Sequence, residues 1–361
     1  MTTPKLWTPD PLHPKLQYLK VVKIEPETGN TNSYYLAPNP EKGTERLAPF
    51  LAGQYLSLTL KIGNMTITRP YSLASSPREA REGTYMLTIE KVEGGLASQF
   101  IHDTWVLGSE VIASEPLGRF TYDPLRDART VIGVVGGCSI TPFRSLAMAV
   151  ADGDVDCDLI LLYGTRTLEE TMFQTDLKAL EAGCPRLKMV NVFSDEQRKG
   201  YEHGFITADL IRKYAPQGEY SLFVCGPQAM RKAVNKEIET LGLSRQFIQN
   251  ELLGEFFGPE QEADYPEQVA PAFRVTVRIG QTEQTITAPG GISLLRSLEA
   301  AGIAAPAHCR SGECGWCRSR LVSGEVYTPR PTEGDRLPSC IHPCCSFPLS
   351  DLTIELPPMA E

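Results

Sequence analysis

The stretch TVIGVVGGCSITPFRSLAMAVADG, residues 130–153, decides the fold of the middle of the chain. An apolar run ends in Gly136-Gly137, and a helix-type segment begins a few residues later at Thr141-Pro142. Proline suits the first position of a helix. A glycine-rich turn between a strand and a helix lets a dinucleotide approach the helix N-terminus closely. This stretch therefore predicts a strand, a nucleotide-binding turn and a helix.

Three more apolar runs follow at 158–164, 187–194 and 221–226. They alternate with helix-type segments, of which the clearest are LEETMFQTDLKALEAG (168–183) and PQAMRKAVNKEIETLG (227–242). Apolar runs separated by helices indicate a parallel sheet of the doubly wound α/β type. In such sheets ligands bind beyond the carboxyl ends of the strands. We assign this Rossmann-like domain to residues 126–257.

The flanking regions have different patterns. Residues 16–125 carry β-branched and alternating apolar runs broken by Gly, Pro and Asn, which predicts an antiparallel β-barrel. GPEQEADYPEQVAPA (258–272) is acidic, rich in proline and poor in apolar residues, as is typical of a linker that lets a domain swing. A hairpin pattern, one helix and a cysteine-rich loop follow in 273–361, which predicts a small α+β, β-grasp-like domain. The sequence therefore predicts a multidomain chain.

Composition limits the partners. The 361 residues carry 35 Lys+Arg against 44 Asp+Glu, a formal charge of -9, which argues against nucleic acid. No run approaches the roughly 20 apolar residues of a membrane helix, so we expect no membrane insertion. The first fifteen residues lack the apolar core of a signal peptide. We expect a cytoplasmic location.

Six of the ten cysteines crowd into residues 309–345. Within HCRSGECGWC (308–317) they stand as C-x4-C-x2-C, the spacing of a plant-type [2Fe–2S] cluster. Gly312 and Gly315 let the loop curl so that backbone N–H groups point at the sulfurs. Zinc is the alternative, although its sites usually show paired C-x2-4-C knuckles. From spacing alone the fourth ligand is open among Cys340, Cys344 and Cys345.

The run HPCCSFPLSD (342–351) resembles the end of plant-type ferredoxin domains. That resemblance selects Cys344 and leaves Cys340 as a spare thiol. The predicted ligands of the cluster are then Cys309, Cys314, Cys317 and Cys344.

Two further motifs resemble the flavin domain of the ferredoxin–NADP reductase superfamily. One is Arg69-Pro70-Tyr71-Ser72, preceded by Gly-Gln-Tyr at 53–55, and the other is Gly95-Leu96-Ala97-Ser98. The resemblance implies that Arg69 neutralises a flavin phosphate. It places Tyr71 on the isoalloxazine and Ser72 near its N5, with residues 95–98 around a pyrophosphate. The implied cofactor is FAD, with FMN as the alternative.

The nicotinamide motifs resemble the same superfamily. Where relatives carry G-G-x-G-I-T-P, this chain has Ser139 in place of the third glycine. The resemblance places Cys225 of Cys225-Gly226-Pro227 at hydride transfer and Arg166 near the ribose. Asp195 stands where relatives that prefer a phosphate often carry arginine, which favours NADH over NADPH. The residues implied for this cofactor are Gly136, Gly137, Thr141, Pro142, Arg166, Cys225, Gly226 and Pro227.

Relatives end this domain with E-x-F near the flavin. Here Glu251-Leu-Leu stands at the position expected for this motif, whereas Glu255-Phe-Phe257, four residues later, matches its residue types. We retain Glu251 and Phe257 as site residues, so that the predicted catalytic groups are Ser72, Cys225 and Glu251.

The domain order resembles the reductase components of multicomponent oxygenases. It implies that NAD(P)H delivers a hydride and that the flavin passes electrons one at a time through the cluster to a separate redox partner protein. The partner is an oxygenase or a terminal reductase. The alternatives are an electron-transfer subunit of a stable dehydrogenase complex and a non-enzymatic redox sensor.

Overall fold

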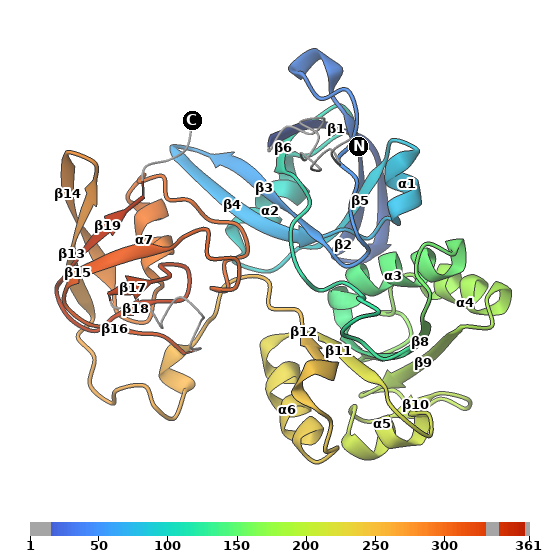
Figure 1. Ribbon diagram of the computed structural model, residues 1–361. Coiled ribbons are helices and arrows are strands. Elements are labelled where there is room, and N and C mark those ends of the chain that lie inside the picture. The colour runs from blue at the N-terminus through green and yellow to red at the C-terminus, as the bar shows by residue number, and fades with distance from the viewer. Residues whose placement is uncertain (1–15, 330–338, 358–361) are drawn as a thin grey trace, which may run out of the picture. The chain divides into compact units, whose positions relative to one another are not determined.

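The structure is a computed structural model that describes residues 16–329 and 339–357 (Figure 1). The described chain forms two compact units. The first contains residues 16–56, 72–227 and 233–249, and the second contains 57–71, 228–232 and 250–357. The predicted domain boundaries at 125, 257 and 272 stay predictions, because these units divide the chain by contacts and not by domain.

The N-terminal part of the first unit is an antiparallel sheet, as predicted. Its strands lie in the order β6 (Glu110–Ser114), β1 (Leu16–Thr28), β2 (Thr31–Pro38) and β5 (Tyr85–Glu90). Alternate side chains of β1 and β2 are buried, as a one-sided sheet requires. The sequence patterns missed β2, because it begins with polar residues and ends in proline. It pairs on both edges, so its backbone groups are satisfied by tertiary contacts.

Two strands and two helices carry the flavin motifs. Strand β3 (Tyr55–Ile62) begins in the first unit and pairs with β4 (Met65–Ser72), and residues 57–71 belong to the second unit. Helix α1 (Pro77–Arg81) begins with a capping box between Ser76 and Glu79. Helix α2 (Leu96–Thr104) begins after Gly95.

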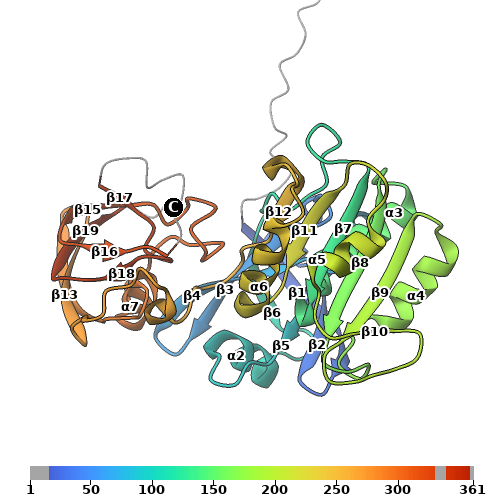
Figure 2. The ribbon, with the colours of Figure 1, turned by 90° about the horizontal axis from the view of Figure 1, so that it is seen from below.

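The remainder of the first unit contains the predicted parallel sheet. Its strand order is β10-β9-β8-β7-β11-β12. The four longest parallel strands are β7 (Thr130–Gly136), β8 (Asp158–Thr165), β9 (Leu187–Phe193) and β11 (Ser221–Cys225), with β10 (Glu202–His203) and β12 (Ile248–Asn250) at the edges. Helices α3 (Thr141–Asp152) and α4 (Gln174–Gly183) cover one face, and α5 (Ala208–Tyr214) and α6 (Gln228–Glu239) cover the other (Figure 2).

Helix α4 is shorter than the pattern at 168–183 predicts. Phe173 has a φ of 55°, in the left-handed region, so the helix begins only at Gln174. Phe173 and Met172 are buried in the apolar core. Burial of these two side chains therefore outweighs the helix propensity of the residues before them.

The barrel strands and the parallel sheet share one apolar core. The ring of Phe120, which follows the barrel strands, stands edge-on to Phe143 of α3 with centroids 5.6 Å apart. It also lies 5.2 Å from the ring of Phe223 on β11. Gly133 on β7 permits close packing, because a Cβ there would lie 2.6 Å from the Phe143 ring. Phe120 thereby packs the end of the barrel region against α3 and the middle of β11.

The second unit contains the small α+β fold predicted for the C-terminus. Its five-stranded sheet has the order β14 (Thr282–Pro289), β13 (Ala272–Ile279), β19 (Leu352–Leu356), β15 (Ser319–Ser323) and β17 (Cys340–Ile341). Helix α7 (Leu294–Ala300) buries Leu294 and Leu298 in the same core as β13 and β19. Strands β16 (Val326–Tyr327) and β18 (Phe347–Pro348) form a second, short pair.

The predicted linker contacts this fold along its length. Tyr327 donates a hydrogen bond from Oη to Asp264 at 2.7 Å, and its ring meets that of Tyr265 edge-on at 4.9 Å. Just before the linker, Phe256 is buried against Phe347. The acidic segment is therefore attached to the C-terminal fold and does not extend as a free chain.

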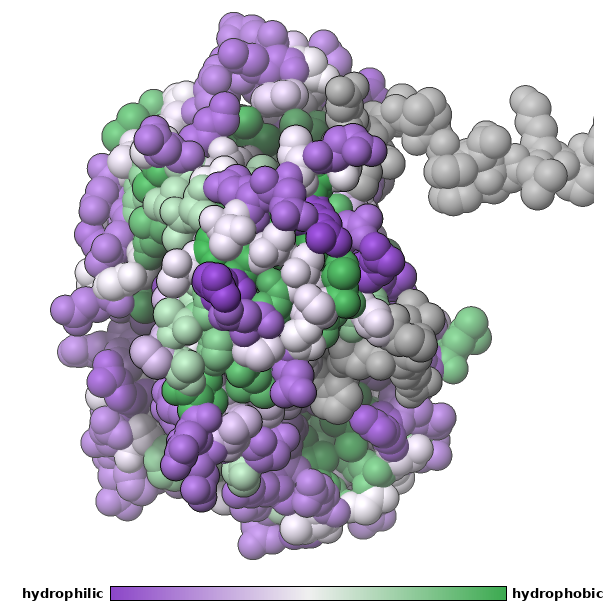
Figure 3. All heavy atoms as spheres, turned by 90° about the vertical axis from the view of Figure 1, so that its left-hand side faces the viewer, coloured by the Kyte–Doolittle hydropathy of each residue, from purple (hydrophilic) through white to green (hydrophobic). Residues whose placement is uncertain are grey.

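One face of the second unit is mixed in polarity. Strand β14 exposes most of its residues, and hydrophobic patches lie between hydrophilic side chains on this face (Figure 3). Among the residues that the structure describes, no helix has both the length and the apolar character needed to cross a bilayer.

Candidate functional site

The four cysteines predicted as cluster ligands lie together in the second unit. Cys309, Cys317 and Cys344 are buried and Cys314 is exposed. The sulfurs of Cys317 and Cys344 are 3.3 Å apart, although 27 positions separate these residues. Hydrogen bonds link the sulfur of Cys309 to those of Cys314 and Cys344. The fold thus gathers four thiols from two distant segments.

The loop also directs backbone donors at a sulfur. The N–H groups of Ser311 and Cys314 point to Cys309 Sγ at 3.5 and 3.3 Å. Gly312 and Gly315 have φ of 87° and 69°, which is the left-handed backbone that lets the loop curl. Hydrogen bonds from the neighbouring thiols lower the pKa of Cys309. A lowered pKa favours the thiolate, which is the form that binds metal.

The four thiols form one connected group, because Cys344 contacts both Cys309 and Cys317, and Cys309 also contacts Cys314. Within residues 16–329 and 339–357, no three His, Cys, Asp or Glu side chains surround a single point where one metal ion would fit. A single zinc ion needs four ligands about one point. A group of four cysteine thiolates suits a [2Fe–2S] cluster, which is held by four such ligands.

Of the other two candidates for the fourth ligand, Cys345 lies beside the four thiols, where it interacts with the thiol of Cys344, whereas Cys340 lies on a strand. Cys345 is buried among Leu295, Ala307 and Cys317 in a small apolar cluster. Cys340 is half-buried on β17, where it pairs with Arg320 of β15. The ligand set remains a prediction.

Arg69 at the predicted flavin site belongs to a group of four charged side chains in the second unit. We call this group the ionic cluster; its members are Arg69, Arg310, Glu255 and Glu299. Its Nη1 donates to the carbonyl of Thr68 at 2.8 Å. Its guanidinium lies 3.6 Å from carboxylate oxygens of both Glu255 and Glu299. Burial and the charge of Arg310 lower the pKa of Arg69, against the opposing effect of the two carboxylates.

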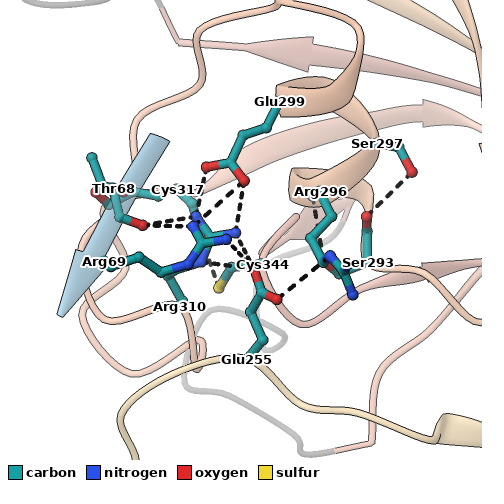
Figure 4. Close-up of polar contacts among 11 residues, drawn as sticks. Thr68, Arg69, Glu255, Ser293, Arg296, Ser297, Glu299, Arg310, Cys317 and Cys344 are labelled. Atoms are coloured by element: carbon teal, nitrogen blue, oxygen red, sulfur yellow. Dashed lines mark hydrogen bonds and ion pairs between the residues drawn. The ribbon is translucent and has the colours of Figure 1, made fainter. Parts of the chain in front are cut away.

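Arg310 holds the centre of the ionic cluster (Figure 4). Its side chain is fully buried and donates to both carboxylate oxygens of Glu299, at 2.6 and 2.8 Å. It donates from Nε to Glu255 at 2.8 Å and from Nη1 to the Thr68 carbonyl at 3.1 Å. Burial alone would raise the pKa of Glu255, but the charges of Arg310 and Arg69 outweigh it and hold that pKa below its usual value. Both carboxylates, those of Glu255 and Glu299, thus form ion pairs with the buried guanidinium of Arg310.

The second flavin motif forms a tight turn in the first unit. The Ser98 hydroxyl accepts a hydrogen bond from the Val92 N–H at 3.1 Å, and Gly95 N–H donates to the Val92 carbonyl at 3.0 Å. A Cβ at Gly95 would lie 2.7 Å from the Ser98 hydroxyl and 2.9 Å from the Val92 carbonyl. Only glycine fits there. Leu96 and Ala97 begin α2, so N–H groups of this helix start lie beside the turn.

The nucleotide turn of the parallel sheet follows β7. Gly137 has a φ of 54°, and a short 3-10 turn (Gly137–Ile140) leads into α3, which begins at Thr141 and Pro142 as predicted. Tyr163 Oη donates to the Gly137 carbonyl at 3.1 Å and fixes the turn. Ser139, which stands where relatives have a third glycine, is half-buried on this turn.

The remaining nicotinamide residues also lie at the carboxyl ends of the strands. Cys225 ends β11 beside Val135 of β7, and Gly226 and Pro227 lead into α6. Arg166 is exposed after β8, where it pairs with Glu170 at 2.8 Å. Its carbonyl accepts from the N–H of Asp195, which follows β9. The fold therefore brings the ribose candidates Arg166 and Asp195 side by side.

Glu251 and Phe257 differ in their surroundings. Glu251 is buried, its Oε2 has no hydrogen-bond partner among the described residues, and burial raises its pKa to about 8. Three residues later, Gly254 N–H donates to the Cys309 carbonyl at 2.9 Å, which holds this segment on the cysteine loop. Phe257 is 58% exposed, with the Arg296 guanidinium 5.8 Å from its ring.

Sequence reasoning missed the ionic cluster. Sequence reasoning considered Glu255 only because Glu255-Phe-Phe257 matches the E-x-F motif, and it did not single out Arg310 or Glu299. Arg310 was detectable, because it directly follows the first cysteine of the loop. Glu299 lies within an amphipathic helix, and its partner is apparent only in three dimensions.

Comparison with known protein families assigns all three parts of the chain. Residues 19–122 match the oxidoreductase FAD-binding domain, 134–236 the oxidoreductase NAD-binding domain, and 277–349 the 2Fe-2S iron-sulfur cluster binding domain.

Similar proteins share this arrangement over nearly their whole length. The glycine betaine monooxygenase reductase subunit of Chromohalobacter salexigens is 25% identical over 356 residues, which cover 93% of this chain and 94% of that protein. NADH oxidoreductase HCR of Escherichia coli is 25% identical over 309 residues, covering 85% and 89%. The solved structure of phthalate dioxygenase reductase superposes with a TM-score of 0.68 at 25% identity, covering 94% of this chain and 98% of that one.

The predicted family, fold class and cofactors are thus confirmed at the level of domains. The chain is an oxidoreductase with FAD-binding, NAD-binding and 2Fe-2S domains in an architecture like that of phthalate dioxygenase reductase.

Proposed function

We propose that this chain oxidises NADH and passes the electrons one at a time to a separate oxygenase or terminal reductase. The observation that carries the proposal is a hydrogen bond from Thr68 Oγ1 to the Ala307 carbonyl at 2.8 Å. Thr68 directly precedes the R-P-Y-S motif, and Ala307 lies two residues before Cys309. Residues 69–71 of the flavin motif and the cysteine loop therefore belong to one compact unit and are adjacent in it.

The chemistry of the cofactors explains the domain order. When bound, FAD accepts a hydride, and the [2Fe–2S] centre accepts and releases single electrons. One NADH and two oxidised acceptor molecules then give one NAD⁺, two reduced acceptor molecules and one proton. The oxidant is the partner protein. Relatives of nearly the same length are reductase subunits of monooxygenases, which supports a separate acceptor over a stable complex or a sensor.

We assign the following roles to residues of this chain. Arg69 binds the flavin phosphate, and Gly95 to Ser98 bind a pyrophosphate through N–H groups at the start of α2. Tyr71 covers the ring system and excludes water from it. Gly136 and Gly137 admit the NADH phosphates near the start of α3. Cys309, Cys314, Cys317 and Cys344 hold the iron.

Three residues act close to hydride transfer in this proposal. Ser72 ends β4, and its hydroxyl orients N5 of the flavin. Cys225 ends β11 and positions the nicotinamide ring. Glu251 keeps its proton at neutral pH because burial raises its pKa to about 8, so it provides an uncharged carboxyl group at the site. Phe257 shields the ring system from solvent.

Asp195 supports the preference for NADH. Its carboxylate lies beside Arg166 on the carboxyl edge of the sheet, and it accepts a hydrogen bond from its neighbour Ser194 at 2.6 Å. A carboxylate there can accept hydrogen bonds from a ribose hydroxyl and repels a 2′-phosphate.

An anaerobic titration with NADH tests the whole proposal. We expect the flavin absorption and the broad iron–sulfur bands to bleach together, and one NADH to reduce two equivalents of a one-electron acceptor. If only the flavin absorption bleaches, the cysteine loop does not hold a cluster that the flavin can reduce. A sensor would show no steady NADH-dependent reduction of an artificial acceptor.

A further inference from the structure

Arg310 links four segments of the second unit that are distant in the sequence. It belongs to the cysteine loop, Glu299 belongs to α7, and Glu255 lies in the segment after β12. Its third partner is the carbonyl of Thr68 on β4. In Figure 4 the guanidinium of Arg310 lies between the two carboxylates, with Thr68 at one side.

The hydrogen bonds of this group are unequal. Arg310 has short contacts of 2.6 and 2.8 Å to Glu299, in the bidentate geometry that gives the strongest ion pairs. Arg69 reaches the same carboxylates only at 3.6 Å. Arg310 is therefore the principal cation for both carboxylates, and Arg69 remains available to an anion.

The position of Arg310 connects the two predicted cofactor sites. On one side it is covalently attached to Cys309, and on the other it is hydrogen-bonded to Thr68, the residue before Arg69. The bond from Thr68 Oγ1 to Ala307 is a second tie between the same strand and the same loop. Both ties lie within two residues of Cys309. These two ties thus fix the position of β4 relative to the first cluster cysteine. The side chains that form them, Thr68 and Arg310, have no assigned role in binding a cofactor.

We propose that Arg310, clamped by Glu255 and Glu299, is a positioning residue that holds the cysteine loop against β4 for electron transfer from the flavin to the cluster. With FAD and the cluster bound, one electron at a time would pass from the reduced flavin to one ferric ion, the second after the acceptor protein has taken the first, and one proton would go to solvent. The inference rests on the proposed function. It replaces the swinging domain predicted from the acidic linker with a fixed contact between the cysteine loop and β4.

The test uses four variants of the full-length holoprotein. Arg310→Lys keeps the positive charge, but one ammonium group cannot bridge two carboxylates and a carbonyl as a guanidinium does. Arg310→Gln removes the charge as well. Thr68→Val removes only the hydroxyl tie to Ala307. Arg320→Gln is the matched control, because Arg320 forms an exposed ion pair with Glu355 on the same domain.

We measure iron content, the midpoint potential of the cluster, and the two steps of a single turnover by anaerobic stopped-flow. NADH should reduce the flavin at the wild-type rate in every variant. Transfer from flavin to cluster, normalised to bound iron, should slow several-fold in Arg310→Lys, because electron transfer slows as donor and acceptor move apart. Thr68→Val should slow the same step, and Arg320→Gln should not.

The potential separates position from charge. Arg310→Lys should keep the wild-type cluster potential, whereas Arg310→Gln should lower it, because a lost cation disfavours the more negative reduced cluster. A wild-type transfer rate per cluster in Arg310→Lys or in Thr68→Val overturns the proposal. If the Lys variant does not fold, Thr68→Val still decides it. Failure of the proposed function is distinct, because the wild-type protein would then show no NADH-dependent flavin reduction.

Discussion

Arg144, near the start of α3, donates a hydrogen bond from Nη1 to the carbonyl of Ala74 at 2.7 Å. Both residues are buried, and Ala74 lies two positions after Ser72. The helix that follows the nucleotide turn is therefore attached directly to the end of the flavin motif. The same guanidinium lies 3.5 Å from Asp176 of α4, so one side chain joins the barrel to two helices.

Arg144→Met should lower the free energy of unfolding by about 1–3 kcal/mol, because it leaves the buried Ala74 carbonyl without its donor. Chemical denaturation measures this change. The control is Arg81→Met, which removes an exposed ion pair to Asp154 and should cost less than about 1 kcal/mol. Equal effects of the two substitutions would contradict the importance of the buried hydrogen bond.

Gly95→Ala should weaken flavin binding. The new Cβ would lie 2.7 Å from the Ser98 hydroxyl, so the turn must open by an amount that typically costs about 1–3 kcal/mol. We expect the dissociation constant for FAD to rise about tenfold, as measured by the recovery of flavin fluorescence. Gly183→Ala at the end of α4 is the control, since a Cβ there has no atom within 4 Å. Unchanged affinity in Gly95→Ala would exclude this turn from the flavin site.

Cys344→Ser should abolish the cluster. Its sulfur lies 3.3 Å from that of Cys317, and a hydroxyl is a poor replacement for a soft thiolate. Iron content and visible absorption measure the loss. Cys345→Ser and Cys340→Ser should both retain iron, although Cys345→Ser should destabilise the apolar cluster around Leu295. Loss of iron in Cys345→Ser with retention in Cys344→Ser would move the fourth ligand by one residue.

Asp195→Arg should shift the cofactor preference toward NADPH. The wild-type carboxylate repels a 2′-phosphate, and an arginine would attract it. We expect the ratio of kcat/KM for NADPH to that for NADH to rise about tenfold or more. Asp209→Arg, an equal change of charge at an exposed site on α5, should leave the ratio unchanged. A wild-type protein that prefers NADPH would refute the assignment before any variant is made.

Glu251 should make stability depend on pH. Burial raises its pKa from 4.5 to about 8, so between these values the folded state binds a proton that the unfolded state has released. The free energy of unfolding should therefore fall as pH rises from about 4.5 to about 8. Glu251→Gln should remove this contribution. The free energy of unfolding of the variant should therefore rise relative to that of the wild type as pH rises, by up to roughly 4 kcal/mol. Denaturation at pH 5, 7 and 9 measures the slope.

Glu239→Gln is the matched control, because it changes a carboxylate on the exposed face of α6. Its stability should follow that of the wild type at all three values of pH. An equal slope in Glu251→Gln and in the wild type would show that Glu251 is ionised throughout this range.

Local patterns predicted much of this fold. The C-x4-C-x2-C spacing, the Gly136-Gly137 turn and the start of α3 depend on residues close together in the sequence, so their geometry is encoded locally. Strand β2 and the late start of α4 were missed, because pairing on both edges and burial of Phe173 decide them.

The ionic cluster could not be predicted from any single stretch. Arg310, Glu299 and Glu255 lie in a loop, a helix and an extended segment, and each is charged and would ordinarily be placed in solvent. Only the fold brings them together, with Thr68 from a strand more than 180 positions away. Buried ion pairs of this kind depend on tertiary structure, whereas ligand spacing does not.

The division of the chain at Leu56 and Ser57 has a practical consequence for protein engineers. A ferredoxin module cut out at residue 258 or 273 and fused to another reductase would leave Thr68 behind. The Ala307 carbonyl and one N–H of Arg310 would then need new partners on the recipient. A working chimera should therefore carry the hairpin 57–71 with the module, or graft a threonine at the matching position of the recipient strand.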